Sequence, residues 1–176
     1  MSSTFSLETK RLRLRPVTTE DIDDLVALHD DPLVARYMGA RDREWYEWRV
    51  KASAEEWAQR GHGLTAIVDL ADGRFLGRTG LKYWPQFDET ELGWVLRPQA
   101  RGHGFATEGA GAVLRWGFDQ FDPPYFTAMI RPDNVASIAV AERLGMKPIR
   151  LDELDGDPLT IYASGPAAPP AMPLTA

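Results

Sequence analysis

The sequence predicts one domain of the α/β (α+β) class, with a mixed, mostly antiparallel sheet of seven strands and about four helices. Two tight turns, Asp72-Gly73 and Asp155-Gly156, each join segments of alternating apolar and polar residues, which is typical of antiparallel hairpins. A helical pattern instead separates the strands expected at 89–96 and 125–130, and such a crossover makes two neighbouring strands parallel. A chain of 176 residues, 44% of them hydrophobic, supports one core.

The first third of the chain predicts a strand followed by helices. Leu12 and Leu14 alternate with Arg11, Arg13 and Arg15 in a strand that ends at Pro16, so one face of this strand is buried and its arginine row is expected to be a solvated face. Helical patterns follow at 18–29 and 31–38, and a longer one at 42–60 carries three tryptophans. We expect His29 and most of these tryptophans to pack in the core, because large side chains at helical spacing usually do.

The middle of the chain predicts a hairpin, a third strand and a helix. Strands are expected at 64–70 and 75–84, and Gly77 and Gly80 in the second of them indicate a bulge or a close backbone approach. The strand at 89–96 ends at a proline, and a helix with one apolar side begins after a short loop.

The last third predicts a strand at 125–130, a helix that Asn134 caps and Gly145 ends, and two final strands near 147–154 and 159–163. The remaining residues are rich in alanine and proline and carry no charge. We therefore expect a single domain over 1–163 and a disordered tail over 164–176.

Charge and cysteine content narrow the function classes. The 26 acidic and 20 basic side chains give a net charge of −6, which disfavours nucleic acid as a partner. The chain has no cysteine and its three histidines stand far apart, so neither a disulfide nor a metal site is expected. No apolar run is long enough to span a membrane, and the N-terminus has no export signal. We expect a cytoplasmic protein without a membrane partner.

The loop before the central helix, Arg101-Gly102-His103-Gly104, is the strongest candidate for a binding site. Its glycines remove side chains where the backbone enters the helix, and the first N–H groups of a helix are unpaired and favour an anion such as a pyrophosphate. The alternative is a tight turn that binds nothing. A dinucleotide fingerprint requires a small residue where Thr107 stands, and no Lys-Ser or Lys-Thr pair completes a P-loop.

This loop resembles the acetyl-CoA pyrophosphate loop of the GNAT superfamily of N-acetyltransferases. The strand before it and the later stretch NVASIAVAERLGM at 134–146 resemble neighbouring motifs of that superfamily, in the same order. LETKRLRLRP at 7–16 and DDPLVARYM at 30–38 are similar to the opening of its RimJ/RimL branch, the ribosomal-protein N-terminal acetyltransferases. The resemblance extends over about 7–163.

The resemblance implies a splayed parallel strand pair and acetyl-CoA as co-substrate, with no metal. The implied acetyl-CoA contacts match the free strand edge, the glycine loop and the cap of the later helix. These residues are Val95, Leu96, Arg101, Gly102, His103, Gly104, Phe105, Ala106, Thr107 and Asn134.

The implied reaction is direct transfer of the acetyl group to a primary amine in a ternary complex. Glu91 matches the place of a glutamate base in several relatives, with Glu89 as its rival, although an ordinary exposed carboxylate is the alternative for Glu91. Ala141 stands where many relatives have a tyrosine acid, so Ser137 is carried as its substitute. Ser137 also suits a simple capping role.

The acceptor is expected to be a protein N-terminal α-amine or a small amine. By resemblance, the candidates for acceptor contacts are Tyr37, Trp45, Trp48 and Glu89. Two alternatives stay open: an acyl-CoA-binding module without turnover, and an aminoglycoside-type antibiotic acetyltransferase. The second requires a pocket lined with carboxylates, for which the chain offers Glu44, Glu47, Glu55, Asp88 and Glu89. The tryptophans also leave a homodimer open.

Overall fold

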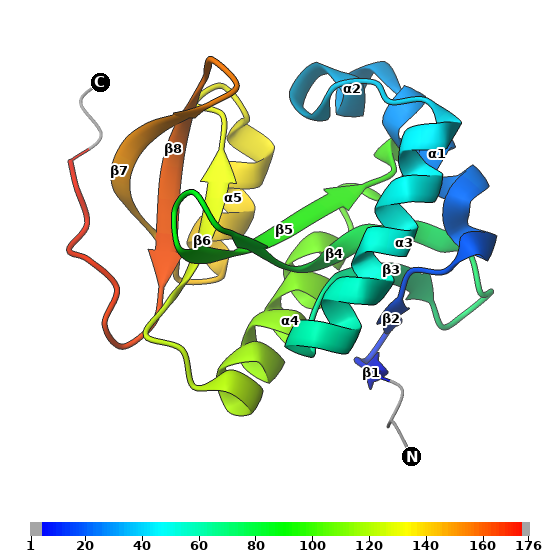
Figure 1. The fold of residues 1–176 in the computed structure, drawn as a ribbon, viewed down its shortest axis with the longest axis horizontal. Coiled ribbons are helices and arrows are strands. Elements are labelled where there is room, and N and C mark those ends of the chain that lie inside the picture. Colours follow the sequence, from blue (N-terminus) through cyan, green and yellow to red (C-terminus); the bar gives the residue numbers. More distant parts are fainter. Residues whose placement is uncertain (1–4, 174–176) are drawn as a thin grey trace.

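The computed structural model describes residues 5–173 and has one mixed sheet with helices on both of its faces (Figure 1). The strand order is β1-β2-β3-β4-β5-β6-β8-β7. The strands are β1 (Leu7–Glu8), β2 (Leu12–Pro16), β3 (Leu64–Asp69), β4 (Phe75–Trp84), β5 (Glu89–Leu96), β6 (Phe126–Ile130), β7 (Lys147–Leu154) and β8 (Asp157–Ser164). The helices are α1 (Ile22–Asp30), α2 (Pro32–Met38), α3 (Arg43–Arg60), α4 (Phe105–Phe121) and α5 (Val135–Arg143), with short 3₁₀ turns η1 (Thr19–Asp21) and η2 (Pro98–Ala100).

The sheet is larger than the sequence predicted, with eight strands instead of seven and five α-helices instead of about four. The extra strand β1 has two residues and pairs antiparallel with β2 through Leu7 and Leu14. Two residues are too few to show an alternating pattern, so the sequence carries no sign of β1. The strand is defined by its pairing with the edge of β2. None of the helices within residues 5–173 is long and apolar enough to cross a membrane.

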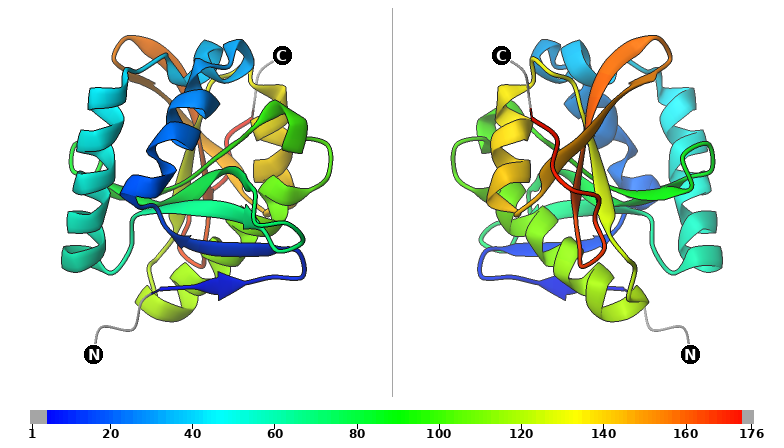
Figure 2. Two further views of the ribbon diagram at one scale, coloured as in Figure 1. Left: turned by 90° about the vertical axis from the view of Figure 1, so that its right-hand side faces the viewer. Right: turned by 90° about the vertical axis from the view of Figure 1, so that its left-hand side faces the viewer.

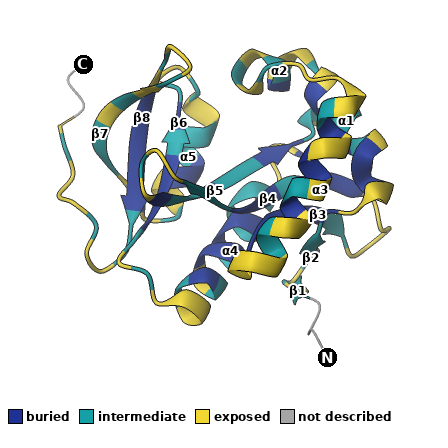
Figure 3. Ribbon diagram, in the orientation of Figure 1, coloured by how far each residue is buried: buried dark blue, intermediate teal, exposed yellow. Residues whose placement is uncertain are grey.

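Two helical layers cover the sheet, with α1, α2 and α3 on one face and α4 on the other (Figure 2). Ala110, Val113 and Leu114 of α4 pack against leucines of β2, β4 and β5. Val95 and residues of α1 and α3 form a second cluster on the opposite face. Figure 3 shows buried inner faces and exposed outer faces on these helices. Because side chains alternate along a strand, β5 directs Leu92, Trp94 and Leu96 to the α4 side, and Val95 to α1–α3.

The glycines of β4 allow the close backbone approach that the sequence indicated. A Cβ at Gly77 would lie 2.2 Å from the carbonyl oxygen of Val95, and one at Gly80 would lie 2.3 Å from that of Gly63. The register between β3 and β4 also shifts between Ile67 and Val68, where a bulge lies. Any side chain at the two glycines would force the strands apart.

The parallel strands β5 and β6 pair only at Glu91 and Thr127. Beyond this point β5 continues to pair with β4 as far as Leu96, and β6 with β8. The two strands therefore diverge, which leaves the β6-facing backbone edge of β5 without a partner strand. The splayed pair implied by the resemblance is confirmed.

The C-terminal segment lies against the domain. Ser164, expected to begin a disordered tail, is the last residue of β8. The backbone N–H of Ala167 donates to Pro124 at 3.0 Å, and that of Met172 donates to Pro148 at 2.8 Å. The structure thus differs from the expected disorder over 164–173, because free backbone groups at the sheet end accept these hydrogen bonds. Residues 1–4 of the expected domain and 174–176 of the tail lie outside the described residues.

Candidate active site

The glycine loop presents the start of α4 without a side-chain cap. Gly102 and Gly104 have φ values of +79° and +80°, a left-handed conformation that other residues adopt at a cost. Gly104 is the N-cap residue, and no side chain hydrogen-bonds to the first turn of the helix. Nothing lies within 4 Å of a Cβ placed at Gly102, so the loop leaves open space beside the helix start. An uncapped helix N-terminus beside open space fits an anionic group such as a pyrophosphate.

Arg11 of the loop between β1 and β2 holds this helix start in place. Its guanidinium donates to the carbonyl oxygen of His103 at 2.9 Å and to Glu108 at 2.7 Å, and lies 4.4 Å from the ring centre of Phe105. The hydroxyl of Thr9 donates to Glu108 at 2.6 Å. Burial would raise the pKa of Glu108, but the hydrogen bonds from Thr9 and Arg11 outweigh it and lower that pKa.

The expected solvated arginine row is thus wrong for Arg11, and also for Arg15. Arg15 makes two hydrogen bonds of 2.7 and 2.8 Å to buried Asp21. The sequence carried no signal for either pair across helix and strand, since Glu108 follows Arg11 by nearly a hundred residues. Arg13 alone matches the expectation, because both it and its partner Glu8 are about half exposed.

We predict that Arg11→Ala weakens the helix start, whereas the matched control Arg13→Ala does not. Arg11→Ala should raise the KM for acetyl-CoA and lower the free energy of unfolding by about 1 kcal/mol, a value reduced for its partial exposure. The lowered pKa of Glu108 stabilises the fold above its unfolded pKa and loses this effect as the pH falls through the folded value. Arg11→Ala should therefore lose less stability on acidification than wild type. Denaturant unfolding between pH 7 and 3 measures this; identical pH profiles would contradict it.

Glu91 lies where β5 and β6 diverge. Its carboxylate accepts a hydrogen bond from Trp84 Nε1 at 2.6 Å and lies opposite Lys82 of β4. Burial raises its pKa, although Trp84, Lys82 and the backbone N–H of Met129 each oppose the rise. A carboxylate with a raised pKa is a better general base near neutral pH than an exposed one. The alternative of an ordinary exposed strand carboxylate is wrong, because Glu91 is partly buried.

Glu89, the rival base and a candidate acceptor contact, is occupied by other partners. Arg150 of β7 binds both of its carboxylate oxygens at 2.8 Å, and the Tyr125 hydroxyl donates to it at 3.3 Å. Only 8% of the residue is exposed. An acceptor amine would have to displace Arg150 from this carboxylate, so the arrangement favours Glu91 as the base.

The start of α5 carries the expected cap. Asn134 Oδ1 accepts a hydrogen bond from the backbone N–H of Ser137 at 3.2 Å, and Ser137 is partly buried in the first turn. Ala141 is fully buried in a cluster with Ile130 and Tyr162, against which Trp94 also packs. The position that the resemblance matched to a tyrosine acid therefore belongs to the core here.

The acceptor-contact candidates divide into two groups. Tyr37 of α2 donates from its hydroxyl to the carbonyl oxygen of Asp133 at 3.3 Å, and Arg36 pairs with the Asp133 carboxylate at 2.8 Å, so α2 reaches the loop that precedes α5. Trp45 instead packs edge-on against Tyr46 at 4.9 Å, and Trp48 is 60% exposed. Only Tyr37 is joined by a hydrogen bond to the residues beside Asn134.

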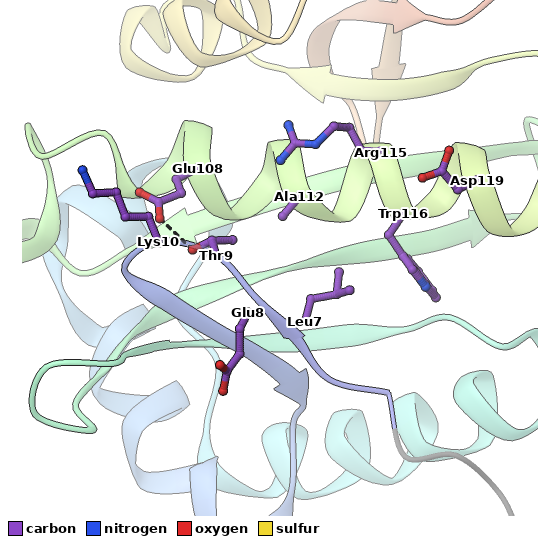
Figure 4. A pocket seen from close by; sticks show the side chains of 9 residues that line it. All are labelled: Leu7, Glu8, Thr9, Lys10, Glu108, Ala112, Arg115, Trp116 and Asp119. Carbon is purple, nitrogen blue, oxygen red and sulfur yellow. Dashed lines mark hydrogen bonds between the residues drawn. The ribbon is translucent and has the colours of Figure 1, made fainter.

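Two grooves lie away from Glu91. One, of about 530 Å³, separates β1 from the outer side of α4, between Thr9, Glu108 and Trp116 (Figure 4). The other, of about 440 Å³, lies beside Arg11 and Phe105. Neither is lined by Glu91, so the diverging strands, and not the larger groove, hold the groups suited to acetyl transfer.

Comparison with known proteins identifies the family to which this chain belongs. Residues 11–147 match the model of the acetyltransferase (GNAT) domain. The uncharacterized N-acetyltransferase YnaD of Bacillus subtilis (strain 168) is 35% identical over 145 residues, covering 80% of this chain and 82% of YnaD. An acetyltransferase structure from Agrobacterium tumefaciens str. C58 has a TM-score of 0.80 and 31% identity, covering 93% of this chain and 96% of that one.

A further structure shares the fold. RimL, a ribosomal L7/L12 alpha-N-protein acetyltransferase in complex with coenzyme A, has a TM-score of 0.77 at 20% identity and covers 93% of this chain and all of its own. The family match extends over well more than half of the chain, and the uncapped glycine loop and the divergent strands agree with it. The chain therefore belongs to the GNAT family of acetyltransferases and is an N-acetyltransferase that uses acetyl-CoA.

Proposed function

We propose that this enzyme transfers the acetyl group to a primary amine by direct attack in a ternary complex, with Glu91 as the general base. The observation that carries the proposal is the place of the Glu91 carboxylate at the divergence of β5 and β6. The free edge of β5 at Val95 and Leu96 leads from there toward the glycine loop. Acetyl-CoA would lie along this path, with its pyrophosphate at the start of α4 and its pantetheine arm on the strand edge.

The pyrophosphate contacts are assigned to the loop and the first turn of α4. Backbone N–H groups of Phe105, Ala106 and Thr107 are the helix donors, and Arg101 and His103 add exposed basic side chains beside them. Asn134 already caps α5 through its side-chain oxygen, so its amide nitrogen is the group left for the pantetheine arm. Charge-assisted hydrogen bonds to a pyrophosphate are the strongest of these contacts.

The demand on the base depends on the amine. An α-amine with a pKa near 8 costs only about 1 to 1.5 kcal/mol to deprotonate at neutral pH, whereas a lysine costs about 4 to 5 kcal/mol. Glu91 with its raised pKa suits the first task, directly or through a water. The backbone N–H of Val95 or Leu96 is the proposed donor to the oxyanion.

The acceptor we propose is an N-terminal α-amine or a small amine, which is also consistent with the substrate named for RimL. An aminoglycoside is less favoured, because the acidic residues that would line its pocket do not meet at Glu91. Glu44, Glu47, Glu55 and Asp88 are exposed, and Glu89 is bound to Arg150. A polycation would instead meet Arg49, Arg78 and Lys82 on the face that Glu91 shares.

Calorimetry with acetyl-CoA, followed by release of the CoA thiol with a panel of α-amine peptides and a panel of aminoglycosides, tests this proposal. Micromolar binding with turnover on the peptide panel is the expected result. Turnover on aminoglycosides alone would overturn the proposed acceptor class. Failure to bind acetyl-CoA would overturn the assignment of the loop.

We predict a small effect for the proposed acid. A CoA thiol with a pKa near 8.5 is a tolerable leaving group, so Ser137→Ala should lower kcat by about tenfold or less without changing the KM for acetyl-CoA. The fold should be unaffected, because Asn134 supplies the cap. The matched variant Asn134→Ala should lose about 1 kcal/mol of unfolding free energy. Steady-state kinetic assays measure kcat for Ser137→Ala, and denaturant unfolding measures the stability of Asn134→Ala. An unchanged kcat in Ser137→Ala would show that water, and not Ser137, protonates the CoA thiolate.

A further inference from the structure

Arg78 of β4 carries a charge that no carboxylate of residues 5–173 neutralises through an ion pair. Its Nε donates to His29 Nε2 at 3.3 Å, whereas most other arginines of the described chain pair with an acidic side chain. Arg78 is only partly exposed, and burial lowers its pKa to about 10. An unpaired, half-buried guanidinium is unfavourable unless a ligand compensates it.

The side chains of His29 and Tyr46, which surround Arg78, carry no negative charge. His29 and Tyr46 are 3% and 1% exposed. Since His29 Nε2 accepts from Arg78, the neutral ring carries its proton on Nδ1, and neither this nitrogen nor the Tyr46 hydroxyl has a hydrogen-bond partner within the described chain. Buried polar atoms without a partner are rare in folded proteins, and here they leave Arg78 with no charged acceptor among the side chains of α1 and α3 that are packed beside it.

This cluster lies on the same face of the sheet as the proposed base. Arg78 is directly opposite Val95, and Lys82 is directly opposite Glu91, on the face that α1 and α3 cover. The Lys82 ammonium lies 3.5 Å from the Trp84 ring centre and makes no ion pair in the described part of the chain. The two carboxylates of β5 on this face are Glu89, which is bound to Arg150, and Glu91, which the reaction requires for the amine.

We propose that Arg78 binds a carboxylate of the acceptor, so that the substrate is an amine that also carries a carboxylate. The inference rests on the proposed function, because it places the amine at Glu91. Val95 follows Glu91 by four residues, a rise of roughly 13 Å along an extended strand. Burial raises the pKa of Glu91 and the Arg78 charge opposes this rise, so the two side chains lie within electrostatic reach of each other. We take this separation to suit an amine and a carboxylate one or two residues apart. The carboxylate is either the free C-terminus of a short peptide or an acidic side chain at the second position of a protein N-terminus.

Matched acceptor pairs test the inference on the intact enzyme. One pair is Ala-Ala and Ala-Ala-amide, and the other is Ser-Glu-Ala-amide and Ser-Gln-Ala-amide. Wild type should show a kcat/KM about tenfold to hundredfold higher for the carboxylate member of one pair, the range expected for hydrogen bonds to a charged group. The pair that shows the preference identifies the source of the carboxylate.

Arg78→Gln should abolish this preference, so that kcat/KM becomes equal for the two members of the pair. The ratio of the two values is the readout, because the Arg78 charge also opposes the burial-driven rise in the pKa of Glu91 and its loss affects both members alike. The control Arg74→Gln removes an exposed arginine of the β3–β4 turn. This variant should keep the preference for the carboxylate member. Arg78→Gln should also keep or raise the melting temperature, since it removes an uncompensated charge. A fall in melting temperature with equal losses on both members would assign Arg78 a structural role.

The wild-type measurements are decisive even if a variant fails to fold. Equal turnover of both members of each pair would overturn the carboxylate site and leave the proposed N-acetylation intact. Binding of acetyl-CoA without turnover of any of the four α-amines would overturn the proposed acceptor class, and the carboxylate site with it.

Discussion

Replacing Glu91 by glutamine should lower kcat by about a hundredfold to ten-thousandfold, the range that general-base catalysis typically contributes. The amide keeps an oxygen for the hydrogen bond from Trp84 but no longer accepts the proton of the amine. Binding of acetyl-CoA, measured by calorimetry, should be unchanged. Kinetic assays with an α-amine peptide at saturating acetyl-CoA measure the loss.

The pH dependence gives a second readout for Glu91. Because its pKa is raised, wild-type kcat/KM should fall as the pH drops through that value, and the residual activity of Glu91→Gln should lack this acidic limb. The same raised pKa means that the charged carboxylate costs stability above its unfolded pKa, near 4.3. Glu91→Gln should therefore be at least as stable as wild type at pH 7, and this difference should vanish below about pH 4.

Glu89→Gln is the matched control, two residues before the base on the same strand face. It breaks the ion pair with Arg150 and should cost about 1.5 to 3 kcal/mol of unfolding free energy, the value for hydrogen bonds to a charged group, because Arg150 is partly exposed and keeps Asp152 as a partner. Its activity per folded molecule should stay close to wild type. If Glu89→Gln remains folded but inactive while Glu91→Gln turns over normally, Glu89 is the base.

A valine at position 104 should weaken acetyl-CoA binding by about a hundredfold or more, because each backbone hydrogen bond to a charged group contributes about 1.5 to 3 kcal/mol. Gly104 has a φ of +80°, and its Cβ position lies 3.6 Å from Arg11 Nη2, at the entrance to the helix N–H groups. A branched side chain there would hold the pyrophosphate away from these donors. Calorimetry measures the change in affinity.

Gly73→Val separates the loss of binding from backbone strain. Gly73 has a φ of +76°, with nothing within 4 Å of its Cβ position, and lies in the β3–β4 turn. Both valine variants should lose roughly 1 to 2 kcal/mol of stability from the left-handed conformation. Only Gly104→Val should lose affinity for acetyl-CoA. Unchanged affinity in a folded Gly104→Val protein would refute the role of the loop.

The elements that the sequence predicted well depend on neighbours within a few residues. The cap at Asn134, the N-cap Asp42 with its hydrogen bond to the Trp45 N–H, and the turn at Asp72-Gly73 were all expected and are confirmed. Each involves groups at most four positions apart, so the local residue types are sufficient to specify them. The glycine loop belongs to the same class, because its backbone conformation and the helix start are local properties.

The residues that the sequence analysis missed depend on pairs that are distant along the chain. Arg11 meets Glu108, and Arg78 meets His29, only after the strands and helices have assembled. A row of arginines on a strand is usually solvated, so its pattern held no sign of these partners. The ion pair of Glu89 could not be predicted for the same reason, because its partner Arg150 lies on β7, far away along the chain.

By itself, the sequence determined the fold class, the order of nearly all strands and helices and the glycine loop before α4. The resemblance to the GNAT superfamily supplied Glu91 as the candidate base. Tertiary structure alone decided which charges are neutralised: it buries Glu89 against Arg150 and leaves Glu91 beside the diverging strands with a raised pKa. It also leaves Arg78 without a carboxylate partner in the described chain. The physical reason is that pattern and turn chemistry act over a few residues, whereas desolvation and ion pairing depend on what the whole fold places nearby.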